Sequence, residues 1–264
     1  MRVHDVNCLC NRPRARVATL SFALLVLFGQ DVAAQSELPF GAGERLTYHV
    51  RVDKMRASGK GTMWIEGPVD LRGTSTLLLR SAVEVGVGPI KAINHTDSWL
   101  DVNRMASLRF EQRHRYLWSR RNSDVELYPE EMRWTGSKGD SGISLTDTPL
   151  DELSFIYYIR TLSLEPDSSW SLNRHFDAER NPVCIRVLGR ETIHSALGEF
   201  EVIVTELRVR DPRFSGEGVI RLFMTADGDR VPLRIESSLP GLGNAVFTLE
   251  TFVRSPARAV VDQR

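Results

Sequence analysis

The feature that most constrains the fold of this chain is an alternation of apolar and polar residues that returns in several short runs. The first run has apolar side chains at every second position, at Leu46, Tyr48, Val50 and Val52. Because successive side chains of a β-strand point to opposite faces, this period of two predicts a strand with one buried and one solvated face. Further runs of the same kind lie at 77–85, 183–187, 231–235 and 245–249.

Turn-forming residues separate these runs. They include Gly59-Lys60-Gly61, Gly67-Pro68, Gly88-Pro89, Asp211-Pro212, Asp227-Gly228 and Pro240-Gly241. Short strands, frequent turns and one-sided burial are typical of antiparallel sheets. We therefore expect an all-β fold, either a single large curved antiparallel sheet or a partly closed β-barrel, with one mid-chain α-helix.

That helix is predicted near 149–162. Thr148 offers a cap, Pro149 suits the first helical position, and Asp151 places an acid in the first turn. The residues that follow supply a broad apolar stripe at helical spacing, and the helix should end before Pro166.

The helix divides the chain into two strand-rich blocks, 44–135 and 170–253. We expect 44–253 to form a single β-rich domain. The stretch 135–147 is rich in Gly, Ser, Asp and Thr and is predicted to be a flexible connector, and 254–264 is predicted to be a flexible tail.

The first 34 residues have the three parts of a secretory signal peptide. Arg12, Arg14 and Arg16 precede a short apolar run at 17–28, and small residues lead to Ala34. We expect cleavage after about Ala34, followed by a lead-in at 35–43. Gln35 stands where a lipoprotein would need Cys, so the product should be a free periplasmic protein with no stable membrane span.

The charge balance and the cysteine content argue against a nucleic-acid-binding protein and against a protein stabilised by internal disulfides. The chain carries 34 basic and 34 acidic residues, a balance that gives no overall attraction for nucleic acid. Cys8 and Cys10 would leave with the signal peptide, so that Cys184 would stand alone without an internal disulfide.

No pattern of catalytic or metal-binding residues is present. The histidines are far apart, without the spacing of a zinc site, and no nucleophile motif such as Gly-x-Ser-x-Gly occurs. Cys184 lies between Val183 and Ile185, where a thiol behaves as a small apolar group. We expect no enzymatic activity and no cofactor.

The candidate ligand-binding residues lie in the most charged stretch. They are Arg109, Arg113, Arg115, Tyr116 and Trp118. On a strand the three arginines would share one face, and the aromatic residues would lie on the other. This arrangement could bind phosphates or an acidic envelope polymer. The interleaved Glu111 favours the alternative, a solvated sheet face with its aromatic side chains in the core.

Several short segments, taken in order, resemble the bacterial family called domain of unknown function 3108. They are Pro39-Phe40 with Gly43-Glu44, Leu46 and Tyr48; Pro149-Leu150-Asp151 through Tyr157-Tyr158-Ile159-Arg160; Gly198-Glu199-Phe200-Glu201-Val202; Asp227-Gly228-Asp229-Arg230-Val231-Pro232-Leu233-Arg234-Ile235; and the strand from Gly243 to Leu249. The resemblance spans about 39–253 and is least clear between about 86 and 147. It implies an exported, mainly β envelope protein without established activity, and it brings no catalytic residues.

Two functions fit these expectations. A curved sheet could enclose an apolar cavity that binds a lipid-like or other amphipathic envelope ligand. Alternatively, the protein could be a scaffold or assembly factor that docks another envelope protein through a sheet face or edge.

Overall fold

The computed structural model of the chain describes residues 36–54, 56–116, 119–210, 217–239, 243–256 and 258–261. The predicted signal peptide and the candidate residue Trp118 lie outside these ranges.

The described residues form a mainly β structure with one α-helix, α1 (Glu152–Thr161). Two short 3-10 helices are η1 (Pro129–Glu131) and η2 (Ala178–Arg180). The strands are β1 (Ser36–Glu37), β2 (Arg45–Val52), β3 (Ala57–Leu71), β4 (Thr74–Val87), β5 (Ile90–Asp101), β6 (Ala106–Tyr116), β7 (Ser119–Tyr128), β8 (Arg133–Gly136), β9 (Ser141–Ile143), β10 (Ser169–Leu172), β11 (Val183–Ser195), β12 (Gly198–Arg210), β13 (Glu217–Thr225), β14 (Pro232–Leu239), β15 (Gly243–Val253) and β16 (Val260–Val261).

Fourteen of these strands form one antiparallel sheet, in the order β10-β11-β12-β13-β14-β15-β2-β3-β4-β5-β6-β7-β8-β9. The two blocks of strands expected from the sequence are therefore joined where β15 pairs with β2, for example at Phe247 and Val50. The two edges, β9 and β10, come from the middle of the chain and do not pair with each other among the described residues. The sheet thus resembles a barrel that is not closed by hydrogen bonds.

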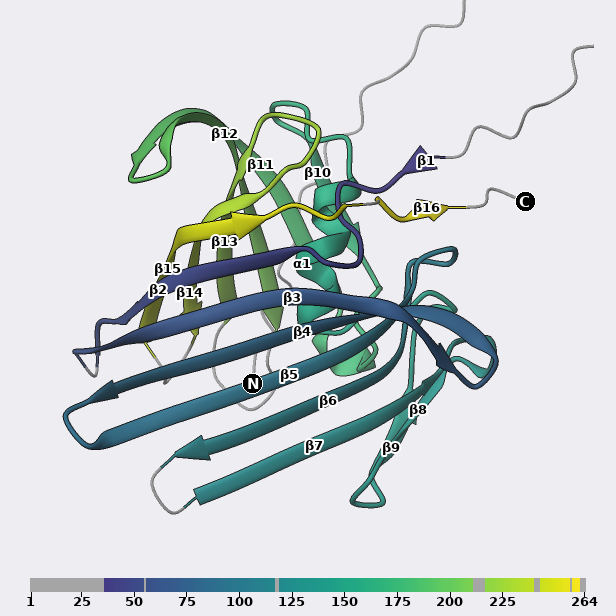
Figure 1. Cartoon of the computed structure of the whole chain (residues 1–264). Helices are drawn as coiled ribbons and strands as arrows, with labels where there is room; N and C mark the ends of the chain where they lie inside the picture. The colour runs from purple at the N-terminus through teal and green to yellow at the C-terminus, as the bar shows by residue number, and fades with distance from the viewer. Residues whose placement is uncertain are drawn as a thin grey trace, which may run out of the picture.

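Helix α1 lies inside the curve of this sheet. Figure 1 shows it between a wall made by β3–β7 and a second wall made by β10–β13. Leu153, Tyr157 and Ile159 are buried in the same core cluster as inward-facing side chains such as Leu79 and Leu222. The helix therefore fills much of the space that a closed barrel of this size would leave open.

Loops rather than strands cover the gap between β9 and β10. Phe176 packs against Phe110, Val125 and Leu127, which come from β6 and β7. Ser144 donates a side-chain hydrogen bond to the Phe176 carbonyl at 2.8 Å. These contacts hold the two walls together without extending the ladder.

The start of α1 differs from the sequence prediction. Asp151, and not Thr148, is the N-cap, and Pro149 precedes the helix instead of occupying its first position. The Asp151 carboxylate accepts hydrogen bonds from the backbone N–H groups of Leu153 and Ser154, and the Asp151 backbone N–H donates one to the Ser154 hydroxyl oxygen. This reciprocal capping box satisfies amide groups that Thr148 cannot reach. The helix ends before Pro166, as predicted.

Two segments expected to be flexible contain strand structure. The connector 135–147 includes β9, which pairs with β8. Part of the tail 254–264 forms β16, which pairs with β1, and backbone hydrogen bonds join Leu38 to Ala259 and Ala259 to Phe40. Short segments of this kind lack a long alternation, so their pairing depends on contacts that a period in the sequence does not reveal.

Pro232 explains one irregularity of the sheet. It lies at the start of β14, between two other strands, and the register of β13 and β14 shifts next to it. A proline has no amide hydrogen for the ladder, so a bulge accommodates it there. Across the described part of the chain, no helix is long and apolar enough to cross a membrane.

Candidate ligand cavity

A cavity of about 210 Å³ lies between the concave face of the sheet and α1. Strands β2–β6 and β13–β15 contribute to its wall, as do three residues of α1. Its apolar lining includes Met63, Val83, Leu153, Ile156 and Phe247. The walls come from strands that are neighbours around the sheet, so the cavity is a property of its curvature.

Glycine at position 61 helps to shape this cavity. Gly61 lies on the cavity wall, and a Cβ there would meet Val50 at 3.1 Å and Phe247 at 3.2 Å. Such contacts are tighter than ordinary van der Waals packing, so the missing side chain lets β3 lie close to these two residues. The seam between the two blocks of strands, where β15 pairs with β2, is therefore closely packed beside the cavity.

Polar side chains cross the opposite wall in two rows. Ser81, Thr96 and Gln112 are aligned across β4, β5 and β6, and Val83, Asn94 and His114 form the next row. Ser81, Thr96, Gln112 and Asn94 line the cavity. A mainly apolar space with a few fixed polar groups is typical of sites for small amphipathic molecules.

Two buried acceptors on the wall have no hydrogen-bond partner among the described residues. They are the Asn94 Oδ1 and Glu152 Oε2 atoms. Leaving a buried acceptor unpaired costs on the order of 1–3 kcal/mol.

Glu152 is the first residue of α1 and is held from outside the cavity. Its Oε1 accepts a hydrogen bond from Arg180 at 2.7 Å and lies 3.7 Å from His175 Nε2. Burial acts to raise the pKa of Glu152, but His175 and Arg180 outweigh it and lower the pKa to about 2. The cavity therefore has a carboxylate, an anionic group, at one end near neutral pH.

The N-terminus of α1 is fixed by buried polar contacts. The Ser98 hydroxyl on β5 donates to Asp151 Oδ2 at 2.5 Å, and the Ser107 hydroxyl on β6 donates to Ser154 at 2.8 Å. Burial raises the pKa of Asp151, and the hydrogen bonds from Ser107, Ser98 and Ser154 oppose this shift. These contacts set the position of the helix that covers the cavity.

The C-terminal end of α1 is held by a buried ion pair. Arg160 donates hydrogen bonds to both oxygens of Glu44, at 2.7 and 2.8 Å, and to the carbonyl groups of Pro39 and Asp229. Burial acts to lower the pKa of Arg160, but Glu44 reverses the effect and raises it. Together, these bonds join the lead-in, the helix and the β13–β14 turn.

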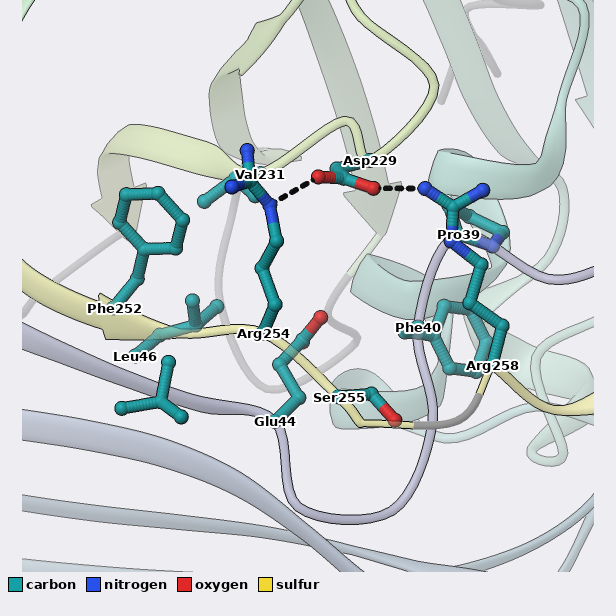
Figure 2. Close-up of a pocket in the computed structure, with 11 residues that line it drawn as sticks. Pro39, Phe40, Glu44, Leu46, Asp229, Val231, Phe252, Arg254, Ser255 and Arg258 are labelled. Atoms are coloured by element: carbon teal, nitrogen blue, oxygen red, sulfur yellow. Dashed lines mark hydrogen bonds and ion pairs between the residues drawn. The ribbon is translucent and has the colours of Figure 1, made fainter.

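A smaller cavity of about 120 Å³ adjoins this ion pair. Figure 2 shows Asp229 pointing toward Arg254 on one side and Arg258 on the other, with Phe40 and Glu44 below. Burial acts to raise the pKa of Asp229, and the two arginines outweigh it and lower the pKa. Because the charged groups of this pocket pair with one another, we interpret it as a structural joint between the lead-in, helix α1 and the β13–β14 turn.

Four of the five candidate residues from the sequence are described, and none of these four lines the cavity. Arg109 donates to Asp124 at 3.2 and 3.0 Å, and Arg113 donates to Asp97 at 3.0 Å, so both lie among acidic side chains. Arg115 and Tyr116 are exposed near the end of β6. Trp118 lies outside the described residues. A ligand-binding role for these five residues stays a prediction.

The sequence interpretation missed the residues that do line the cavity. Ser81, Asn94, Thr96 and Gln112 are polar residues on strands β4–β6, where no role was assigned to them. Their alternation with outward-facing residues could have placed them on one face of a strand. It could not have indicated that this face encloses a space.

The described part of the chain brings neither a metal-ligating cluster nor its cysteine thiol to the cavity. Within the described ranges, no group of three or more His, Cys, Asp or Glu side chains could hold a metal ion. Cys184 lies half-buried on β11, outside the cavity lining.

Comparison with known proteins gives a family but no activity. Residues 47–250 match the family described as protein of unknown function (DUF3108). No curated protein matches the chain.

The solved structures that are similar to this chain include the following two. One is a β-barrel-like protein of domain of unknown function DUF1849 from Brucella abortus, with a TM-score of 0.55, 9% sequence identity and coverage of 80% of this chain and 97% of that chain. The other, from Bacteroides fragilis, is proposed to be exported and has a YmcC-like fold, with a TM-score of 0.27, 10% identity and coverage of 84% and 100%. The first supports a β-barrel-like fold, and the second carries no further argument.

Proposed function

The chain belongs to the DUF3108 family of proteins of unknown function, and from that premise we propose that it binds an amphipathic, lipid-like ligand in the cavity between the sheet and α1. The observation that carries this proposal is the pair of unpartnered acceptors, Asn94 Oδ1 and Glu152 Oε2, in an otherwise largely apolar wall. Burial of an apolar ligand segment would supply affinity, and the acceptors would orient a donor-bearing group.

The size of the cavity limits what it can hold. About 210 Å³ is below the 300–1,000 Å³ that is usual for sites of drug-sized ligands. A whole phospholipid would not fit. We propose that one apolar segment occupies the cavity and that its hydroxyl or ammonium group contacts Glu152.

We further propose that the protein acts in the periplasm and is not an enzyme. The signal-peptide features of the first 34 residues support the location. The cavity supplies binding groups but no nucleophile paired with a base, which supports a binding role.

The test is native mass spectrometry of protein purified from its own envelope. We expect an added mass that organic extraction removes and identifies as a lipid-like molecule. Only the apo mass, even after incubation with an envelope lipid extract, would contradict the proposal. Turnover of ester, glycoside or phosphate substrates would contradict the non-enzymatic part.

A substitution on the wall sharpens this test. Val83→Phe should place a ring in the cavity and reduce ligand occupancy by about tenfold, since roughly 1.4 kcal/mol of lost binding corresponds to that factor. Ala82→Phe adds the same group on the opposite face of β4 and should leave occupancy unchanged. Equal occupancy in both variants would place the ligand elsewhere.

The scaffold alternative rests on a different feature. Exposed apolar residues gather beside the short edge strand β9, with Ile143 64%, Leu145 48% and Met132 48% exposed. An open edge with apolar neighbours can accept a partner strand. Crosslinking through β9 to one envelope protein, together with a ligand-free mass, would favour this function over the first.

A further inference from the structure

The ends of three pairs of strands lie together at one end of the barrel. The pairs are β2–β3, β4–β5 and β6–β7, and Figure 1 shows their ends in a row at the left of the molecule. The strand register confirms that they are level, since Ser58 pairs with Gly86 and Ala92 with Tyr116. We call the described residues 51–54, 56–58, 84–91, 114–116 and 119–121 the hairpin rim.

The hairpin rim is basic, although the chain as a whole is neutral. It carries seven basic and two acidic residues, whereas the whole chain has 34 of each. The turns at the other end of the same strands, at 69–76, 101–106 and 128–133, carry three basic and four acidic residues. The positive charge is therefore concentrated at one end of the sheet.

The arginines of the β6–β7 hairpin have no acidic residue directly opposite them, and Arg115 interacts electrostatically with the exposed Glu84, two strands away. Arg115 lies directly opposite Arg120, and Arg121 lies opposite His114. Farther along the same strands, Arg109 lies opposite Glu126 and bonds to Asp124. Like charges directly opposite each other on neighbouring strands are destabilising. In the middle of β6 and β7, acidic side chains of the protein balance the charge of Arg109. At the hairpin end, an external anion would reduce the repulsion between Arg115 and Arg120.

Apolar side chains are exposed between these charges. Val87 is 50% exposed, and Ile90 and Tyr116 are each 46% exposed. Val87 pairs with Ile90, so the two form the tip of the β4–β5 hairpin. Apolar and aromatic tips flanked by Lys and Arg are typical of proteins that lie at the interface of anionic bilayers.

We propose that the hairpin rim docks on the surface of an anionic phospholipid bilayer. Arg115, Arg120 and Arg121 contact lipid phosphates, and Val87, Ile90 and Tyr116 enter the headgroup boundary. The charge concentrated at this end of the molecule is complementary to such a surface. This surface is separate from the cavity and does not depend on the proposed ligand.

Vesicle cosedimentation tests the proposal with the full protein. We expect the protein to sediment with vesicles containing phosphatidylglycerol, to remain in solution with pure phosphatidylcholine vesicles, and to be released by high salt. Arg115→Ser, Arg120→Ser and Arg121→Ser combined should reduce binding by about tenfold or more, because each basic residue near the surface contributes separately. No sedimentation of the unaltered protein would overturn the proposal.

A matched variant separates local from total charge. Arg104→Ser, Arg133→Ser and Arg190→Ser combined remove the same charge elsewhere and should retain binding, and circular dichroism should show both triple variants folded. Equal loss in the two variants would overturn the assignment to the hairpin rim. So would selective binding of the rim to an anionic polysaccharide with no binding to vesicles. Ile90→Ser should weaken vesicle binding without changing charge, and an unchanged affinity would contradict the apolar contact.

Discussion

Arg160 is fully buried, and its guanidinium is surrounded by charged, polar and aromatic groups. It pairs with both oxygens of Glu44, and its charge lies 5.3 Å from the ring of Phe40 and 5.4 Å from that of Tyr157. A buried ion pair of this kind stabilises a fold little more than an apolar pair of similar volume would. Loss of one partner, however, leaves an uncompensated buried charge. The pair therefore makes the joint sensitive to single substitutions.

Glu44→Gln should lower the free energy of unfolding by about 3 kcal/mol, because Arg160 would remain buried without its counterion. Urea denaturation measures the change. Glu201→Gln is the control, since its partner Arg190 and Glu201 itself are well exposed and should contribute little. A Glu44 variant as stable as this control would show that the guanidinium finds another partner or solvent.

Glu152 should give the protein an acid-sensitive contribution to stability. Its pKa falls from an ordinary value of 4.5 to about 2 on folding, so this contribution is present above pH 4.5 and is lost as the pH falls toward 2. Unfolding midpoints of the unaltered protein and Glu152→Gln should therefore differ near neutral pH and converge in acid. Glu130→Gln serves as the control and should change stability little, because its ion pair with Arg104 is exposed. A constant difference for Glu152→Gln would contradict the assignment.

At the scale of elements, α1 depends on its capping box. Asp151→Ala should lower the free energy of unfolding by about 2 kcal/mol, because it removes a buried cap and leaves the Ser98 hydroxyl without its acceptor. Thermal or urea unfolding measures this loss. Thr148→Ala, at the residue that the sequence pattern favoured as the cap, should change stability far less. A reversed order of the two effects would contradict the observed helix start.

Strands with a clean alternation could be predicted from the sequence, and strands with buried polar residues could not. The run at 46–52 became β2, whereas β5 contains Thr96, Asp97 and Ser98, all of them buried. Those side chains are stabilised inside by partners on other strands and on the helix, such as Asp151 and Arg80. Local pattern cannot identify such partners, so the region between 86 and 147 was the least predictable.

The same reason limited prediction of the candidate site. Val83, Asn94 and Phe247 meet at one cavity because β15 pairs with β2, and this pairing joins distant parts of the chain. The sequence predicted a curved sheet able to enclose a cavity but not which residues would line it. Within the arginine-rich stretch, Arg109 and Arg113 bond to acidic side chains, and Arg115 lies opposite Arg120.

At the scale of the whole molecule, the seam between β15 and β2 unites the two blocks. Thr248 pairs with His49 on one side and with Arg234 on the other. Thr248→Pro should cost about 3 kcal/mol or more, because it removes a ladder hydrogen bond inside the sheet. Ile143→Pro at the edge strand β9 should cost much less. Urea denaturation compares them, and similar losses would contradict the central position of the seam.

The position of that seam also sets an order of events during synthesis. The first long strand to emerge, β2, has one neighbour, β3, available at once, but its other neighbour, β15, is the last long strand of the chain. One side of β2 therefore remains unpaired until the chain has been made as far as β15. Among the strands that have two neighbours in the 14-stranded sheet, β2 waits longest for its second neighbour.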